Sequence, residues 1–127
     1  MLNILLVFLL ALHASLGFGA YAQKAKTASS GLPANYRQIV AKNIREKSWL
    51  KVVGGRITVP HQIFAGFYGF QPGVCVEADV QSPIAGVVTH FWNVVFRDGE
   101  AIAYQLTNPP RGCGGAALSK FPELGKL

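Results

Sequence analysis

The spacing of apolar residues predicts a helix near the start of the folded part of the chain. One stripe of this segment is apolar and the rest of its circumference is basic or polar; the stripe consists of Tyr36, Ile39, Val40 and Ile44. Pro33 suits the first turn of a helix. We therefore expect an amphipathic helix within residues 32–48, with basic side chains toward solvent, namely Arg37, Lys42 and Arg45.

Alternation of apolar and polar residues predicts strands further along. In residues 74–80 small apolar residues alternate with polar positions, which are Cys75, Glu77 and Asp79. Residues 87–96 form a second long strand. A shorter β-branched run, residues 56–59, follows the break at Gly54-Gly55 and stops at Pro60, which favours an edge strand.

Asp98-Gly99 is the strongest hairpin signal in the chain. A two-residue turn at this point would place Arg97 opposite Glu100 and Phe96 opposite Ala101. The hairpin has two apolar faces. Alanines on the first leave room for the helix; this face consists of Trp92, Val94, Phe96, Ala101 and Ala103.

The second face of the hairpin also needs a cover, because one helix cannot cover both. It consists of Phe91, Val95, Ile102, Tyr104 and Leu106. The cover is the C-terminal tail with Phe121 and Leu124 as anchors, or the aromatic segment of residues 61–73, or another molecule.

Residues 61–73 interleave four aromatic rings with glycines; the rings are Phe64, Phe67, Tyr68 and Phe70. Glycine makes a long regular element costly, whereas the rings supply large apolar area. We expect a strand with irregular ends that packs into the core. In the alternative, a loop presents the rings outward as a partner-binding surface, and Arg37, Lys42 and Arg45 steer an acidic partner or a lipid headgroup toward it.

Together these patterns predict an α+β fold. One N-terminal amphipathic helix packs on a small antiparallel sheet of three to five strands, and one disulfide joins Cys75 to Cys113. The two cysteines lack the spacing of a metal site or of a C-x-x-C motif, so a reactive thiol pair is the weaker alternative. Residues 32–127 form one domain, and the polar residues 23–31 form a flexible leader.

Residues 1–22 resemble a secretory signal peptide. An apolar run from Ile4 to Leu12 precedes Ala20-Tyr21-Ala22, which fits the small-x-small cleavage pattern. The run is about half of the ~20 residues that a membrane-crossing helix needs. We predict cleavage after Ala22, which leaves no stable membrane span and a periplasmic or secreted protein; retention as an anchor is the alternative. Gln23 follows the cleavage site, which excludes lipid attachment through an N-terminal cysteine.

The net charge of +6 favours simple solvation or an anionic partner, such as a lipid headgroup or a polyanionic glycan. Export makes nucleic acid an improbable partner. We expect no metal ion or cofactor. An acid–base pair of His90 with Glu77 or Asp79 can be drawn, but the chain lacks a nucleophile elbow and a phosphate-binding glycine loop.

The order of motifs resembles a group of small, uncharacterised exported proteins and lipoproteins of alphaproteobacteria, especially rhizobia. The matching segments are Leu32-Pro33-Ala34-Asn35-Tyr36-Arg37, Cys75-Val76, Phe96-Arg97-Asp98-Gly99, Gly112-Cys113 and Phe121-Pro122-Glu123-Leu124. The resemblance implies a bacterial envelope protein and supplies no activity. We therefore expect a non-enzymatic binding or accessory module whose partner is an envelope protein or an anionic envelope component. A small periplasmic hydrolase that uses His90 with Glu77 or Asp79 is the alternative.

Overall fold

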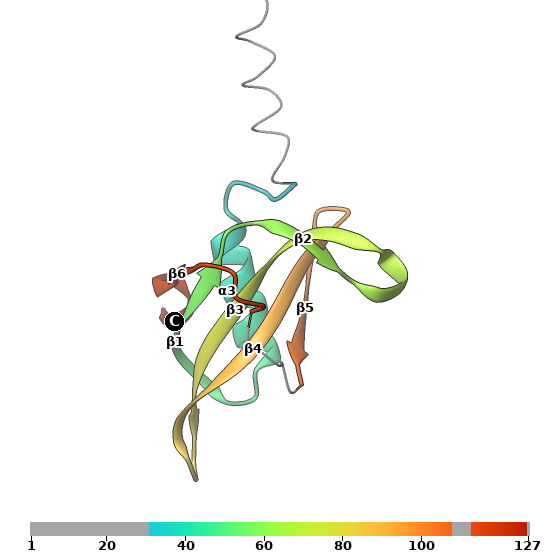
Figure 1. Ribbon diagram of the computed structural model, residues 1–127. Helices are drawn as coiled ribbons and strands as arrows, with labels where there is room; N and C mark the ends of the chain where they lie inside the picture. Colours follow the sequence, from blue (N-terminus) through green and yellow to red (C-terminus); the bar gives the residue numbers. More distant parts are fainter. Residues whose placement is uncertain (1–30, 108–112, 127) are drawn as a thin grey trace, which may run out of the picture. The chain divides into compact units, whose positions relative to one another are not determined.

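The computed structural model describes residues 31–107 and 113–126 (Figure 1). These residues form one α-helix and a six-stranded antiparallel sheet, and one disulfide joins Cys75 of the sheet to Cys113. The elements in chain order are α3 (Tyr36–Lys47), β1 (Lys51–Thr58), β2 (His61–Phe64), the 3-10 turn η1 (Gly66–Tyr68), β3 (Phe70–Ser82), β4 (Gly86–Arg97), β5 (Glu100–Leu106), β6 (Leu118–Lys120) and the 3-10 turn η2 (Pro122–Gly125).

The predicted combination of a helix with an antiparallel sheet is confirmed in outline. The fold is mostly sheet, however, with six strands rather than three to five, and the helix occupies residues 36–47 rather than the N-terminus of the chain. The strand that no sequence pattern predicted is β6, whose three residues are too few to show alternation. The irregular strand expected within residues 61–73 is divided between β2 and the start of β3.

The strand order is β5-β4-β3-β1-β6, and β2 also pairs with β3. At Gly73 the strand β3 has His61 of β2 on one side and Val95 of β4 on the other. Three residues later Ile57 of β1 takes the side that β2 occupied. The strands β1 and β2 therefore follow one another along one side of β3.

The β4–β5 hairpin has the predicted register, with Arg97 opposite Glu100 and Phe96 opposite Ala101. Asp98 and Gly99 both adopt positive φ, 51° and 79°, as a two-residue turn that follows the twist of the strands requires. The hairpin prediction is confirmed.

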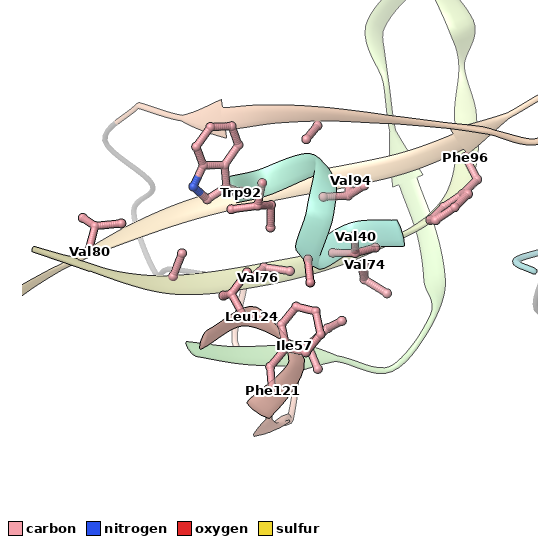
Figure 2. Close-up of a cluster of buried hydrophobic side chains, with 14 residues drawn as sticks. Val40, Ile57, Val74, Val76, Val80, Trp92, Val94, Phe96, Phe121 and Leu124 are labelled. Atoms are coloured by element: carbon pink, nitrogen blue, oxygen red, sulfur yellow. The ribbon is translucent and has the colours of Figure 1, made fainter. Parts of the chain in front are cut away.

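The helix α3 covers the predicted first face of the hairpin (Figure 2). Its buried residues are Val40, Ala41 and Ile44. They join an apolar core with the inward residues of the sheet, among them Val74, Val76, Ala78, Val80, Trp92, Val94, Phe96 and Ala103. Alternation along β3 and β4 leaves Cys75 and Val95 on the opposite side, which we call the open face.

The free edge of β5 is held by two side chains of the helix. Asn43 Nδ2 donates a hydrogen bond to the carbonyl of Ala101 (3.2 Å), and Lys47 Nζ donates one to the carbonyl of Ala103 (2.9 Å). Edge strands carry backbone groups that can pair with another chain. Here the helix supplies donors to two of these acceptors.

Residues 113–126, the C-terminal strap, contact both sides of the sheet. Cys113 forms the predicted disulfide with Cys75, whose position is on the open face. Phe121 and Leu124, in contrast, lie in the core beneath α3 (Figure 2). The expectation that these two residues anchor the tail on the second face of the hairpin is therefore wrong.

The prediction that the first strand lies at an edge is also wrong, because β6 pairs with Arg56, Ile57 and Thr58 of β1. Gly54 and Gly55 do not interrupt the chain but lie within β1, at an irregularity in its pairing with β3. A Cβ atom at Gly55 would stand 2.7 Å from Leu124 Cδ2. It would stand closer still to the backbone carbonyl oxygen of Glu77, so the glycine is explained first by the close approach of β3 and then by that of the strap.

Candidate functional site

The candidate site is the aromatic hairpin, residues 61–73, in which η1 joins β2 to β3. At its tip the N–H of Ala65 donates to the carbonyl of Gly69 (2.8 Å), and the N–H of Gly69 donates to that of Gly66 (3.0 Å). Gly66 and Gly69 adopt positive φ, 60° and 66°, which glycine tolerates without a steric cost. The two glycines thus allow a tight turn with its own hydrogen bonds.

All four rings of the hairpin face solvent. The exposed fractions are 63% for Phe64, 109% for Phe67, 52% for Tyr68 and 68% for Phe70. The expectation that these rings pack into the core is therefore wrong. The pairing of β3 with β4 begins at Gly73, so the tip of the hairpin extends past the strand that would have covered it.

Two of the rings contact each other, and a third contacts a neighbouring cation. Phe64 and Phe70 are cross-strand partners whose centroids lie 5.5 Å apart in an edge-to-face arrangement. The guanidinium carbon of Arg97 lies 3.8 Å from the centroid of Tyr68. Gln71 Nε2 donates to the carbonyl of Tyr68 (2.7 Å). The contact with Arg97 places a positive charge beside the rings.

Between the aromatic hairpin and the open face lies a pocket of about 570 Å³. All its lining residues are uncharged: Phe64, Ala65, Gly66, Phe67, Tyr68, Val95, Ile102 and Tyr104. Three of these belong to the predicted second face of the β4–β5 hairpin. The aromatic segment thus covers part of that face, as one of the three alternatives expected.

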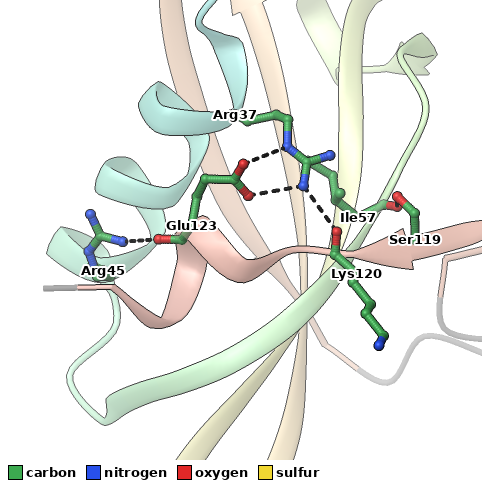
Figure 3. Close-up of polar contacts among 6 residues, drawn as sticks. All are labelled: Arg37, Arg45, Ile57, Ser119, Lys120 and Glu123. Carbon is green, nitrogen blue, oxygen red and sulfur yellow. Dashed lines mark hydrogen bonds and ion pairs between the residues drawn. The ribbon is translucent and has the colours of Figure 1, made fainter.

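The second predicted component, the basic side of the helix, has internal partners (Figure 3). Arg37 Nε and Nη2 donate to the carboxylate oxygens of Glu123 at 3.1 and 2.9 Å, and Nη2 also donates to the carbonyl of Lys120. Arg45 Nη1 donates to the carbonyl of Glu123 at 2.7 Å. These two arginines hold the C-terminal strap against α3. Lys42 is exposed and lies 3.9 Å from the equally exposed Glu46. Steering of a partner by these three residues stays a prediction.

Hydrogen bonding to Arg37 lowers the pKa of the Glu123 carboxyl from its ordinary value, and Coulombic attraction adds to the effect. The same hydrogen bond raises the pKa of Arg37. Each partner therefore favours the charged form of the other.

The residues of the hydrolase alternative are not brought together. His90 pairs with Ala78 across β3 and β4, so its side chain shares the face of Ala78, while Glu77 and Asp79 point to the other face. Glu77 forms an ion pair with Arg56 instead. Asp79 accepts a hydrogen bond from Thr89 Oγ1 (3.1 Å).

Arg97 is the site residue that the sequence alone did not identify. The hairpin register already placed it at the end of β4. Its contact with Tyr68 depends on the reach of the aromatic hairpin beyond that strand end, for which no sequence signal exists.

Within residues 31–107 and 113–126, no three His, Cys, Asp or Glu residues gather in a group that could hold a metal ion. No helix in this part of the chain is long and apolar enough to cross a membrane. Comparison with protein-family models, with curated proteins and with solved structures found no match.

Proposed function

We propose that this protein is exported to the bacterial cell envelope and acts there as a non-enzymatic binding module, with the aromatic hairpin as its contact surface. Its residence would be periplasmic or secreted. The signal-like residues 1–22 and the resemblance to exported alphaproteobacterial proteins support this location. The disulfide between Cys75 and Cys113 is compatible with it, because disulfides persist in oxidising compartments.

The observation that carries the proposal is the exposure of four neighbouring rings around one uncharged pocket. Contiguous exposed apolar surface is uncommon on soluble proteins and marks sites of interaction. Aromatic residues are also prominent among the side chains that dominate binding energy, and each can contribute on the order of 2 kcal/mol. The hairpin is therefore suited to serve as the contact surface of a binding module.

A binding role is favoured over hydrolysis because the two carboxylates predicted to act with His90 have other partners. General acid–base catalysis needs its groups within hydrogen-bond reach of a common reacting atom. His90 and the pair Glu77 and Asp79 instead lie on opposite faces of the sheet.

Site-specific photo-crosslinking in intact cells tests the contact surface. A benzoylphenylalanine replaces Phe67 in one variant and Ile84 in the other. Both positions are exposed, and Ile84 follows the far end of β3, so it is a matched control. We expect adducts from position 67 and few from position 84. Equal yields at both positions would contradict the proposal.

A further inference from the structure

The aromatic hairpin is uncharged over its whole length. Residues 61–76 include no Lys, Arg, Asp or Glu, although the chain has 12 basic and six acidic residues. The charges thus lie entirely outside the hairpin. The other described residues carry nine basic and six acidic side chains, and the remaining three basic residues lie outside the described part. This separation of an apolar aromatic tip from a cationic body is typical of proteins that bind the interface of an anionic bilayer.

The backbone of the tip also suits an apolar environment. Unpaired N–H groups are costly where no water can reach them. The N–H groups of Ala65, Tyr68 and Gly69 all donate to carbonyls of the same turn. The turn can therefore enter the headgroup and upper acyl region without leaving these donors unpaired.

The shape of the site favours a bilayer over a folded protein partner. Phe67 is fully exposed at the end of the turn, and Phe64 and Phe70 flank it on the two strands. A projecting tip can enter a fluid surface of any shape, whereas a protein partner would need a matching hollow. Tyrosine is enriched at the depth of the lipid headgroups, and phenylalanine is among the apolar residues that interfacial segments bury at the boundary with the acyl chains.

Arg97 provides a cation at the base of the tip. Its guanidinium stacks on Tyr68 and its side chain is partly exposed. It would lie beside the lipid phosphates when the rings are inserted. Two carboxylates oppose this attraction, Asp98 at 3.9 Å from Arg97 Nε and Glu100 opposite Arg97 in the register.

From these observations we infer that the aromatic hairpin docks the protein on an anionic lipid surface, with Phe67 inserted and Arg97 at the phosphates. The inference rests on the proposed function, because it names the partner of the same contact surface. It requires no membrane-spanning segment.

Fluorescence of the full chain with vesicles tests the inference. Vesicles of phosphatidylglycerol mixed with phosphatidylcholine are compared with phosphatidylcholine alone, each with and without brominated acyl chains. Trp49 and Trp92 already fluoresce, so quenching is measured as the difference from the unchanged protein in the same vesicles. The added tryptophan of a Phe67→Trp variant should be quenched by bromine in the anionic vesicles. That of Ile84→Trp, at the far end of β3, should not be. Because the label reports its own position, attachment through residues 1–22 gives no false signal at residue 67.

Two further variants measure the strength of docking. Phe67→Ser combined with Tyr68→Ser should weaken vesicle binding by about tenfold or more, since it removes exposed apolar area. Asp98→Asn should strengthen binding to anionic vesicles by roughly fivefold, the effect of about one elementary charge near the surface. Asn-Gly suits the same turn, so this variant keeps the hairpin intact. Phe67→Ser alone is the substitute if the double variant does not fold.

Quenching at residue 84 that equals quenching at residue 67 would overturn the inference, as would a double serine variant that binds like the unchanged protein. Absence of vesicle binding, together with protein adducts from a crosslinker at position 67, would overturn the lipid partner and leave the proposed function intact. Absence of both would overturn both.

Discussion

Arg37 and Glu123 are joined side by side, with two hydrogen bonds of 3.1 and 2.9 Å between guanidinium and carboxylate. Arg37 belongs to the helix α3, and Glu123 belongs to the 3-10 turn η2 in the C-terminal strap. The guanidinium also lies over the ring of Phe121, 5.2 Å from its centroid. A single side chain thus holds the strap by charge, by a hydrogen bond to its backbone and by an aromatic contact.

Replacing Glu123 with Gln should lower the free energy of unfolding by about 1 kcal/mol, because the charge-assisted pair at this partly buried position becomes a neutral one. Urea unfolding at pH 7 measures the change. Glu46→Gln is the matched control, since its contact with Lys42 is exposed and weak. If Glu46→Gln lowered the free energy of unfolding as much as Glu123→Gln, the stabilising role of the Arg37–Glu123 pair would be contradicted.

The contribution of this pair should depend on pH. The carboxyl of Glu123 has a lower pKa in the folded state than its ordinary value of 4.5. Its stabilising effect is therefore complete above that value and is lost as the pH falls through the lowered folded pKa. The stability difference between the unchanged protein and Glu123→Gln should shrink in acid. Unfolding curves of both proteins from pH 7 to pH 3 measure it; a constant difference would be the contrary result.

Adjacent glycines of β1 should respond differently to alanine. A Cβ at Gly55 would collide with the carbonyl of Glu77 and with Leu124, whereas a Cβ at Gly54 meets nothing within 4 Å. We expect Gly55→Ala to lower the free energy of unfolding by about 2 kcal/mol through overpacking, and Gly54→Ala to change it little. Denaturant unfolding compares the two variants. Similar effects would mean that β3 and the strap do not approach Gly55 as closely as described.

The disulfide should account for a large share of the stability. Cys75 and Cys113 close a loop of 38 residues, which corresponds to about 4 kcal/mol in the chain-entropy model. Replacing both cysteines with serine should lower the unfolding free energy by an amount of this order. Intact mass before and after reduction and alkylation tests whether the bond is present in exported protein. Two alkylatable thiols in unreduced material would contradict the pairing.

Removing the helix donors from the edge of β5 should promote self-association. In the variant Asn43→Ala with Lys47→Met, the carbonyls of Ala101 and Ala103 lose their side-chain partners, at a cost of about 1 kcal/mol each. Sedimentation velocity should then detect dimers or larger species that the unchanged protein lacks. Lys42→Met changes an exposed residue of the same helix and is the control. This variant should sediment like the unchanged protein. A monomeric double variant would show that these bonds do not protect the edge.

Sequence patterns predicted the features that depend on neighbouring residues. Asp98-Gly99 fixed the register of the β4–β5 hairpin because the turn type determines which residues face each other. The alternation around Cys75 likewise identified the two faces of β3. Both predictions hold because a strand's side chains alternate whatever lies beyond it.

The exposure of Phe67 and the burial of Phe121 could not be read from the residues themselves, since both are phenylalanines in glycine- and proline-containing segments. Whether each ring is buried depends on which other elements of the fold lie against it. Phe121 follows a strand that pairs with β1, and the N–H of Phe121 donates to the carbonyl of Gly55, which turns the ring toward α3. Phe67 lies beyond the paired part of β4. Such long-range partners leave no periodic signal.

The position of the strap has a consequence for when the domain can fold. Phe121 and Leu124 complete the core against Ile44 and Ile57, yet they follow every other residue of that core along the chain. A nascent chain that still lacks them has no cover for this side of α3 and cannot form the Arg37 contact. Native packing is thus delayed until translation of the domain is finished.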